Sequence, residues 1–454
     1  MSRLVVVSNR VALPRETHAG GLAPALLAAL RERGGAWFGW SGQLAARSAG
    51  EVHRERDGNI TFATIDLSKR DHEDYYNGFA NRSLWPLLHY RPDLVDYQRA
   101  NYQGYVRVNT LFAERLASLI EPGDVVWIHD YHLIPLAALL RERGIDNRIG
   151  FFLHTPLAPP ELLATLPHHR ELFGAFSAYD LVGLQTPQDL RSFQEYFEHE
   201  AGAMLANDSS VGLPDGRRFR AECFPISIDT AAAAQAARAA AGGEAVARLK
   251  YSLDGRALVI GVDRLDYSKG LPERFDAFAR LLQRSEGLIN RVSMLQIAPS
   301  SRAEVPEYRQ IRRELERRAG HINGTWAEPD WVPIRYVNKT IAYAELTGYY
   351  RSANVGLVTP LRDGMNLVAK EYVACQDPRN PGVLVLSRFA GAAQELTAAL
   401  LVNPYDQDGV AEALERALSM PLAERRQRWR AMMTVLEKHD IGAWRSAFLE
   451  TLTA

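Results

Sequence analysis

A buried apolar run and the charged turn after it, RALVIGVDRLDYSKGLPER (256–274), place two cations beside a helix start. Arg264 and Lys269 lie five positions apart, and a planar fork with a point charge suits a diphosphate. The helix pattern opens at Gly270, where backbone amides and the helix dipole favour an anion. Asp266 lies between the two cations, so a structural ion pair with either of them stays an alternative.

A second run, within ANVGLVTPLRDGMNLVAKEYVACQD (353–377), leads to two carboxylates around another helix start. Gly364 permits a tight turn, and residues 365–367 would present free backbone amides. Glu371 lies one helical turn further along and could accept hydrogen bonds from ribose hydroxyls. As alternatives, Glu371 is a charge stabilised by the helix dipole and Asp363 is only an N-cap.

Charged or titratable side chains recur at the ends of predicted strands in both halves of the chain. If the strands are parallel, these side chains project toward one crevice between two domains. For any single residue, a solvated charge at a strand end is an equal alternative, but the whole set favours a site. The residues are Arg10, Asp130, His154, Arg264, Arg302 and Asp363.

The first half offers further groups for a phosphorylated sugar. Gly20 and Gly21 precede the helix pattern LAPALLAALRERG, where they would let a phosphate approach the backbone, or they form a plain turn. Arg10, Arg302 and Tyr76 together suit a clamp on a second anion. Trp85 offers a flat face to a sugar ring, although an aromatic-rich segment is more often core.

Short apolar runs alternate with helix patterns and predict an α/β protein of two doubly wound domains. Continuous apolar strands are those of parallel sheets covered on both faces. We place the domain boundary near residue 228, before the alanine-rich stretch 230–250. The predicted strands are residues 4–8, 124–129, 148–154, 181–185, 257–262, 292–298, 355–359, 382–387 and 399–403, with 219–229 closing the first domain.

The composition is that of an ordinary globular protein. Fifty-three Lys and Arg against 54 Asp and Glu indicate neither a nucleic-acid partner nor a polybasic membrane tail. Cys223 and Cys375 predict buried thiols in a reducing compartment. Neither a signal peptide nor an apolar run of membrane length is apparent, which predicts a cytoplasmic protein. The stretch His168–Arg170 is interpreted as a solvated loop, and GxGxxG, GxxxxGK[ST], HExxH and GxSxG are absent.

Motifs along nearly the whole chain resemble those of trehalose-6-phosphate synthases, a family of retaining glycosyltransferases. The matching segments are SNR (8–10), GGL (20–22), WFGWSG (37–42), WIHDYHL (127–133), RIGFFLH (148–154), RLDYSKG (264–270), PLRDGMNLVAKEYVA (360–374) and VLSRFAGAAQEL (385–396).

The resemblance implies a GT-B type fold, in which two Rossmann-like domains face each other across a cleft. The domains would be residues 1–228 for the acceptor and 229–436 for the nucleotide sugar, with a helix over 437–454 crossing back to the first domain. It implies transfer of glucose from UDP-glucose to glucose 6-phosphate, with retention, in a homo-oligomer (dimer or tetramer). No metal or other cofactor is expected, and neither nucleic acid nor membrane is an expected partner.

The resemblance also assigns roles to residues. Catalysis would involve Arg264, Lys269, His154, Asp130 and Asp363. The donor would bind Gly20, Gly21, Arg264, Lys269, Ile341, Asp363, Met365, Asn366, Leu367, Val368, Ala369, Lys370 and Glu371. The acceptor would bind Arg10, Tyr76, Trp85, Asp130 and Arg302, and Trp85 and Thr155 would set anomer and acceptor selectivity.

Three positions depart from the family's bacterial pattern. Thr155 and Leu157 stand where Ile and Phe are usual, and Ile341 replaces an aromatic residue near the nucleotide base. These departures affect the expected donor base and acceptor fit more than the reaction. Two other functions remain open: the same fold acting on glycerol 3-phosphate or a cyclitol phosphate, and a non-catalytic sensor of sugar phosphates.

Overall fold

The computed structural model describes residues 2–13, 22–45, 50–206, 209–300 and 306–454. The chain forms two compact units. The N-terminal unit combines Met1–Pro225 with Trp444–Ala454, and the C-terminal unit is Ile226–Ala443. The sequence placed the first boundary near residue 228 and a separate last segment at residue 437.

The described part of the N-terminal unit contains a ten-stranded sheet in the order β3-β4-β2-β1-β5-β6-β7-β10-β9-β8. Pairing is parallel from β4 to β10 and antiparallel at both edges. The strands are β1 (Leu4–Arg10), β2 (Gly35–Ala45), β3 (His53–Asp57), β4 (Ile60–Ser68), β5 (Val125–His129), β6 (Arg148–Phe152), β7 (Leu181–Leu184), β8 (Met204–Leu205), β9 (Ser210–Gly212) and β10 (Arg218–Cys223).

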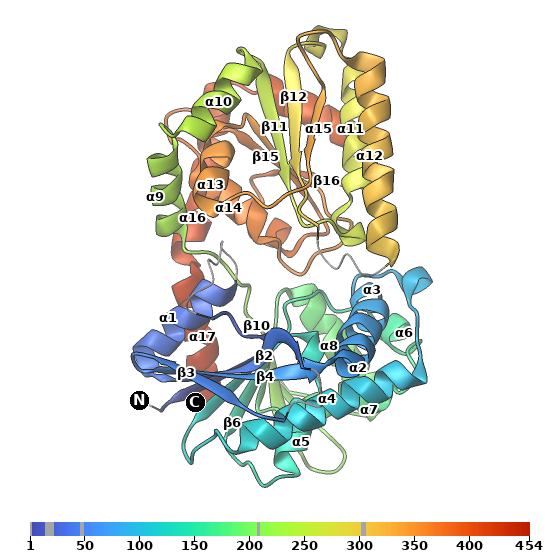
Figure 1. Cartoon of the computed structure of the whole chain (residues 1–454), viewed down its shortest axis with the longest axis vertical. Helices are drawn as coiled ribbons and strands as arrows, with labels where there is room; N and C mark the ends of the chain where they lie inside the picture. The colour runs from blue at the N-terminus through green and yellow to red at the C-terminus, as the bar shows by residue number, and fades with distance from the viewer. Residues whose placement is uncertain (1, 14–21, 46–49, 207–208, 301–305) are drawn as a thin grey trace. The chain divides into compact units, whose positions relative to one another are not determined.

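Helices connect these strands (Figure 1). The α-helices are α1 (Leu22–Arg33), α2 (Lys69–Asp71), α3 (Trp85–Leu88), α4 (Arg99–Ala117), α5 (Leu136–Arg141), α6 (Pro160–Leu163), α7 (His169–Gly174), α8 (Pro187–Ala201) and α17 (Ile441–Thr453). A π-helix, η1, spans His72–Leu84, and the 3-10 helices are η2 (Pro92–Leu94), η3 (Tyr131–Leu133) and η4 (Ala175–Ala178).

Both faces of this sheet are covered, as the continuous apolar strands predict. In β6, Phe151 contacts Phe176 of η4 at 5.1 Å between ring centroids, whereas the next residue, Phe152, contacts Trp444 of α17 at 5.0 Å. Figure 1 shows α17, in red, against the strands of this unit. At Gly183 of β7, a Cβ would lie 2.7 Å from the Phe448 ring, so glycine allows α17 its close approach.

The C-terminal unit is built on a parallel sheet whose described strands have the order β13-β12-β11-β14-β15-β16. Numbered along the chain, this is 3-2-1-4-5-6, the Rossmann order. The strands are β11 (Ala257–Val262), β12 (Val292–Ile297), β13 (Ile334–Val337), β14 (Val355–Val358), β15 (Val383–Ser387) and β16 (Leu400–Val402).

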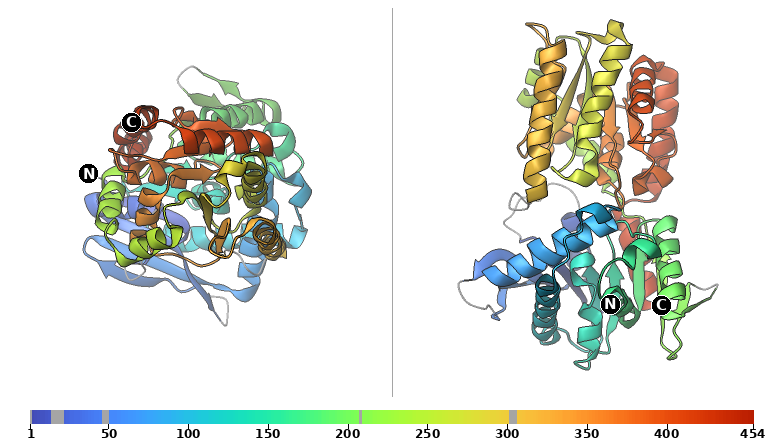
Figure 2. Two further views of the ribbon diagram at one scale, coloured as in Figure 1. Left: turned by 90° about the horizontal axis from the view of Figure 1, so that it is seen from above. Right: turned by 90° about the vertical axis from the view of Figure 1, so that its right-hand side faces the viewer.

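The helices of the C-terminal unit fall into two groups, and the helices of each group pack against one another. One group is α11 (Leu271–Arg284), α12 (Pro306–Trp326) and α15 (Gln407–Ser419), and Figures 1 and 2 both show α11 beside α12. The other group is α9 (Thr230–Ala240), α10 (Glu244–Leu253), α13 (Tyr343–Ser352), α14 (Leu367–Cys375) and α16 (Leu422–Lys438). Short 3-10 helices are η5 (Tyr267–Lys269), η6 (Glu286–Leu288) and η7 (Gly391–Gln394).

The predicted fold class is confirmed, and each predicted strand is present within a few residues of its expected ends. The sequence did not predict β2 and β4, which extend the first sheet, or β13 at the edge of the second. Residues His169–Gly174 form α7 where a solvated loop was expected. None of the described helices has the length and apolar character needed to span a bilayer.

Phe448→Ala is expected to destabilise the N-terminal unit by ~3–5 kcal/mol, the usual loss for truncating a buried phenylalanine. The Phe448 side chain is fully buried and stacks on Trp127, with ring centroids 4.7 Å apart. The measurement is urea unfolding followed by tryptophan fluorescence. Glu450→Ala, on the exposed side of the same helix, is the matched control and should stay within ~0.5 kcal/mol of wild type.

Candidate active site

In each unit, the predicted site residues flank the point where the strand order reverses. In the N-terminal unit this point lies between β1 and β5, and in the C-terminal unit between β11 and β14. In open α/β sheets, ligands bind outside the carboxyl ends of strands at such a point. Each unit therefore has its own candidate ligand-binding edge.

Arg10, the last residue of β1, is exposed at the first of these edges. Its guanidinium lies over Gly42 of β2, where a Cβ would be 2.9 Å from the Arg10 Nε. Gly42 also has φ +89°, in the left-handed region that favours glycine. The WFGWSG motif thus positions the Arg10 guanidinium through a glycine.

Asp130 follows β5 with φ 77° and ψ 163°, a backbone conformation that is essentially restricted to glycine. Its backbone amide donates to the Phe152 carbonyl at 2.8 Å. Its Oδ1 accepts from the His154 backbone amide at 3.3 Å. Such strain at a polar strand end is typical of functional sites. His154 itself follows β6 and hydrogen-bonds through Nε2 to His129 Nδ1 at 3.1 Å.

Aromatic side chains lie beside this edge, and some of them belong to the π-helix η1. The Trp85 amide donates to the Ala80 carbonyl, five residues back, as a π-helix requires. π-helical turns are rare and occur frequently at functional sites. The sequence did not predict this element, because its hydrophobic pattern does not follow the α-helical period.

Tyr76 of η1 is partly exposed, and its ring lies between those of His72 and His132, at 5.4 and 5.8 Å. Trp40 lies at 5.8 Å from the same ring. Sequence reasoning missed Trp40, His72 and His132, although the first and last belong to the WFGWSG and WIHDYHL segments. Only the i,i+4 spacing of His72 and Tyr76 hinted at the stack.

Trp85 and the two unusual residues after His154 are more buried than Tyr76. Trp85 is 6% exposed, and His89 and Tyr131 lie against its ring. Thr155 is 5% exposed and Leu157 is 1% exposed. The proposed contact of Trp85 with a sugar, and the selectivity roles of Trp85 and Thr155, stay predictions.

In the C-terminal unit, the two charged turns are joined by an ion pair. The Lys269 ammonium lies 2.5 Å from the Asp363 Oδ2, and both side chains are largely buried. The Leu361 amide also donates to the Ser268 carbonyl, at 2.8 Å. Arg264, in contrast, is exposed just beyond β11. Of the two predicted cations, Arg264 is therefore exposed, whereas Lys269 is largely buried in an ion pair with Asp363.

Asp266 caps the short helix η5 by accepting from the Ser268 amide at 3.0 Å, and it also accepts from the Tyr308 hydroxyl. Of the two cations that flank Asp266 in the sequence, Lys269 pairs with Asp363. Behind the turn lies Arg274, a fully buried residue that sequence reasoning missed.

Arg274 fixes the turn that carries Lys269. Its guanidinium donates to the carbonyl of Lys269 and to the Oγ1 of Thr359, at 3.3 and 3.1 Å. It also pairs with Asp263 at 2.8 Å, where burial raises the pKa of the carboxyl above its ordinary value. The sequence signal was an arginine on the otherwise apolar face of α11.

Asn366, and not Asp363, is the N-cap of α14. Its φ is 76°, its Oδ1 accepts from the Ala369 amide at 3.2 Å, and its Nδ2 donates to the Asp363 Oδ2 at 3.0 Å. This capping hydrogen bond uses the backbone amide of Ala369, a residue that the sequence predicts to contact the donor substrate. The amides of Leu367 and Val368 have no acceptor within the helix and face the expected position of an anion.

Glu371 is 7% exposed, and burial raises its pKa to about 7. The Lys370 ammonium points elsewhere, since it donates to the Ile226 carbonyl and to Glu395, each at 2.7 Å. Burial lowers the pKa of Lys370, although Glu395 opposes that shift. Any contact of Lys370 with the donor substrate would therefore involve its backbone.

Among the other predicted residues, Met365 is buried and accepts the Ala392 amide at its carbonyl. Ile341 is partly buried and lines a hollow of about 420 Å³ with Leu295, Val337 and Lys339. Gly20, Gly21 and Arg302 lie outside the described residues. Within those residues, no three of His, Cys, Asp and Glu are grouped so as to hold a metal ion.

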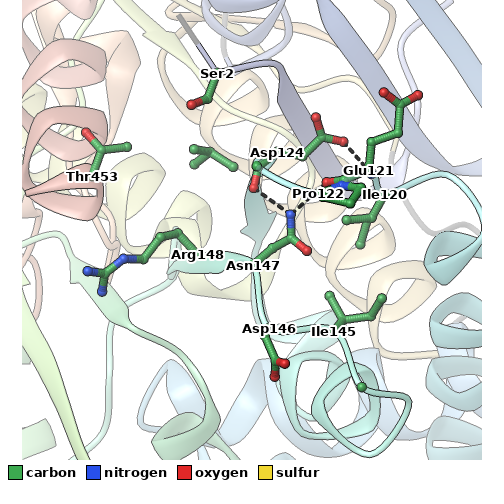
Figure 3. Close-up of a pocket in the computed structure, with 13 residues that line it drawn as sticks. Ser2, Ile120, Glu121, Pro122, Asp124, Ile145, Asp146, Asn147, Arg148 and Thr453 are labelled. Carbon is green, nitrogen blue, oxygen red and sulfur yellow. Dashed lines mark hydrogen bonds between the residues drawn. The ribbon is translucent and has the colours of Figure 1, made fainter.

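Another hollow, of about 630 Å³, lies at the opposite edge of the N-terminal sheet (Figure 3). It is lined by the residues that precede β5 and β6, where the Asn147 amide donates to the carbonyls of Glu121 and Asp124. Strand amino ends are not the ligand-binding edge of an α/β sheet, and none of the predicted site residues lines this hollow.

The chain is similar to known proteins over its whole length. The sequence pattern of glycosyltransferase family 20 matches residues 4–454. The chain belongs to this family.

A trehalose-6-phosphate synthase of Sinorhizobium fredii is 52% identical and aligns over 100% of this chain and 99% of its own. A UDP-forming α,α-trehalose-phosphate synthase of Burkholderia xenovorans, solved in complex with glucose-6-phosphate, is 51% identical with a TM-score of 0.95 and full coverage of both chains. An E. coli structure bound with UDP-2-fluoro glucose is 48% identical with a TM-score of 0.95 and covers 99% of each chain.

Membership of family 20 agrees with the resemblance drawn from the motifs and with the observed fold, which is of the GT-B type. The proposed roles of individual residues rest on the geometry of the two edges and can be tested by substitution.

Asp130→Gly is expected to be more stable than Asp130→Ala by ~1–2 kcal/mol, because only glycine relieves the strain at φ 77°. At an ordinary position the order is reversed, since glycine costs ~0.5–1 kcal/mol relative to alanine. Both variants lose the carboxylate, and both should lose activity. Urea unfolding of the two variants checks the order, and a more stable alanine variant would refute the strain.

Glu371→Gln is expected to change the pH dependence of stability. The folded pKa of Glu371, about 7, lies above the ordinary 4.5, so the folded protein binds the proton more tightly. This contribution is complete below pH 4.5 and is lost as the pH rises through 7. Relative to the glutamine variant, the ligand-free wild type should lose ~3 kcal/mol between pH 5 and 8 in urea unfolding. Equal differences at both pH values would contradict a raised pKa.

Proposed function

We propose that this chain transfers glucose from UDP-glucose to glucose 6-phosphate, with retention of configuration, giving trehalose 6-phosphate and UDP. The observation that carries the proposal is the edge of the C-terminal sheet between β11 and β14. There, Arg264, the Lys269–Asp363 pair and the first amides of α14 form a site for a sugar diphosphate. The related proteins described above support the choice of both substrates.

On the donor side, the diphosphate would take Arg264, Lys269 and the amides of Leu367 and Val368. When the diphosphate binds Lys269, Asp363 is released from part of its ion pair and can accept from a glucose hydroxyl. Glu371 would accept from the ribose in its ionised form, since a carboxylate accepts two hydrogen bonds. Ile341 would contact the base.

On the acceptor side, the phosphate of glucose 6-phosphate would take Arg10, with Tyr76 beside it and Arg302 as a further cation. The carboxylate of Asp130 would accept hydrogen bonds from sugar hydroxyls at the same edge. The strained backbone at Asp130 holds that carboxylate in place before the substrate arrives, which lowers the reorganisation needed in the reaction.

In the reaction, the bond between the glucose anomeric carbon and the diphosphate oxygen breaks, and a bond to the acceptor hydroxyl oxygen forms on the same face. The acceptor proton passes to a diphosphate oxygen. Arg264, Lys269 and the helix amides stabilise the charge that grows on the departing UDP, and one such contact commonly contributes ~3–4 kcal/mol. No protein nucleophile is required.

We also propose that the reaction needs no metal ion, that the protein works as a homo-oligomer, and that it acts in the cytoplasm. The buried thiol of Cys375, which is not in a disulfide, is compatible with a reducing compartment. These three statements rest on the family resemblance and on composition, and each has a direct measurement: activity in EDTA, solution mass and cell fractionation.

The test is a matrix of UDP-, GDP- and ADP-glucose against glucose 6-phosphate, glucose, glycerol 3-phosphate and a cyclitol phosphate. Nucleotide release and product structure are measured. We expect trehalose 6-phosphate from UDP-glucose and glucose 6-phosphate. A different glycoside would establish another acceptor, and binding without nucleotide release would establish a sensor.

Arg264→Ala is expected to lower the rate by at least ~100-fold through the loss of one charge-stabilising contact. Arg291→Ala, an exposed arginine before β12, is the matched control and should keep the wild-type rate. Near-normal turnover by the Arg264 variant would remove Arg264 from the site.

A further inference from the structure

Two histidine rings form a hydrogen-bonded pair at the carboxyl ends of neighbouring strands. His129 is the last residue of β5 and pairs in register with Phe152, the last residue of β6. His154 lies two residues further on. The distance from His129 Nδ1 to His154 Nε2 is 3.1 Å. His129 is 1% exposed, whereas His154 is partly exposed and belongs to the predicted site.

Both rings are neutral near pH 7. Burial lowers the pKa of His154 to about 3, and burial with the neighbouring His154 lowers that of His129 well below its ordinary value. A hydrogen bond between two neutral imidazoles contains one proton, so only two arrangements are possible. Either His129 Nδ1–H donates to His154 Nε2, or His154 Nε2–H donates to His129 Nδ1.

The second nitrogen of His129 distinguishes the two arrangements. His129 Nε2 is buried and has no hydrogen-bond partner among the described residues. If His154 were the donor, His129 Nε2 would carry a buried hydrogen with no acceptor. If His129 is the donor, Nε2 is a bare nitrogen. Orphaned buried N–H groups are the rarer and costlier kind, so the second case is favoured.

The surroundings of His129 favour the same arrangement. The Trp127 ring lies 4.6 Å from the His129 ring, and the Trp444 ring lies 5.1 Å from that of Trp127. The indole nitrogens of both tryptophans are also buried without a partner in the described residues, and an indole nitrogen is a donor only. An unprotonated His129 Nε2 is compatible with the neighbouring indole N–H groups. A protonated Nε2 would add one more buried N–H that has no acceptor.

We propose that His129 is a positioning residue that holds His154 as its Nδ1–H tautomer. Because His154 Nε2 accepts from His129, Nδ1 is the ring nitrogen left for a ligand, and it carries the proton. His154 would then act as a neutral donor to a hydroxyl oxygen of the transferred glucose. This role rests on the proposed function, but the tautomer does not.

The last helix makes the arrangement possible. Trp444 and Phe448 of α17 cover the face of the sheet that carries Trp127 and His129, with Trp444 at 6.4 Å from the His154 ring. With this cover, His129 is only 1% exposed, so bulk solvent does not reach its Nε2. The return of the chain end to the N-terminal unit thus determines the protonation of a site residue.

The first test is nitrogen NMR of the ligand-free protein with ¹⁵N-labelled histidine, with His154→Phe identifying the His154 signals. We expect protonated Nδ1 and bare Nε2 on His154, and the same for His129. In His129→Phe, His154 should lose its preference for Nδ1–H. In His129→Asn, whose amide can donate from nearly the same position, the preference should return.

The second test is glucose transfer. His129→Phe should lower kcat/KM for UDP-glucose by about 10-fold, the equivalent of one lost hydrogen bond, while UDP, which lacks the glucose, binds as before. His129→Asn should recover most of the rate. In a His154→Phe background, His129→Phe should have no further effect, because it acts through His154.

Two results would overturn the proposal: a wild-type His154 that carries its proton on Nε2 or on both nitrogens, or an equal loss of rate from His129→Phe with and without His154. The tautomer result does not depend on which glycoside the protein makes. A failure of the proposed function therefore remains distinguishable from a failure of this inference.

Discussion

Parallel strand pairing positions every proposed site residue of the two sheets. It brings the carboxyl ends of all central strands to one edge of each sheet, and the reversal of strand order separates two connecting segments there. Arg10 and Asp130 flank the reversal in one unit, and Arg264 and Asp363 flank it in the other. The proposed site residues are therefore concentrated at these edges, and helices cover both faces of the apolar strands.

Maintaining these edges has a conformational cost. Asp130 and Asn366 both have positive φ at the ends of strand connections, and in each case hydrogen bonds hold the strained residue. Asn366 caps α14 and also donates to Asp363, so the helix start and the ion pair with Lys269 are one connected network. Strain of this kind persists only where the surrounding contacts over-determine the backbone.

Burial decides the charge of several groups that the sequence presents as ordinary. Burial raises the pKa of Glu371 to about 7 and lowers the pKa values of His129 and His154. Lys370 lies buried between Glu395 and a backbone carbonyl. Arg264, in contrast, is exposed just beyond β11. In the proposed function, a bound diphosphate competes with Asp363 for Lys269, so the electrostatics of this edge would change on binding.

The two parallel α/β units, the strands at their centres and the charged turns could be predicted from the sequence, because apolar runs and glycine turns are local signals. Long motifs also predicted the family. The sequence did not reveal that Lys269 pairs with Asp363, that Asn366 is the cap, that Arg274 supports the turn, or that α17 packs on Trp127 and near His154. These facts depend on residues far apart in the chain, whose meeting is set by packing and burial and by no local pattern.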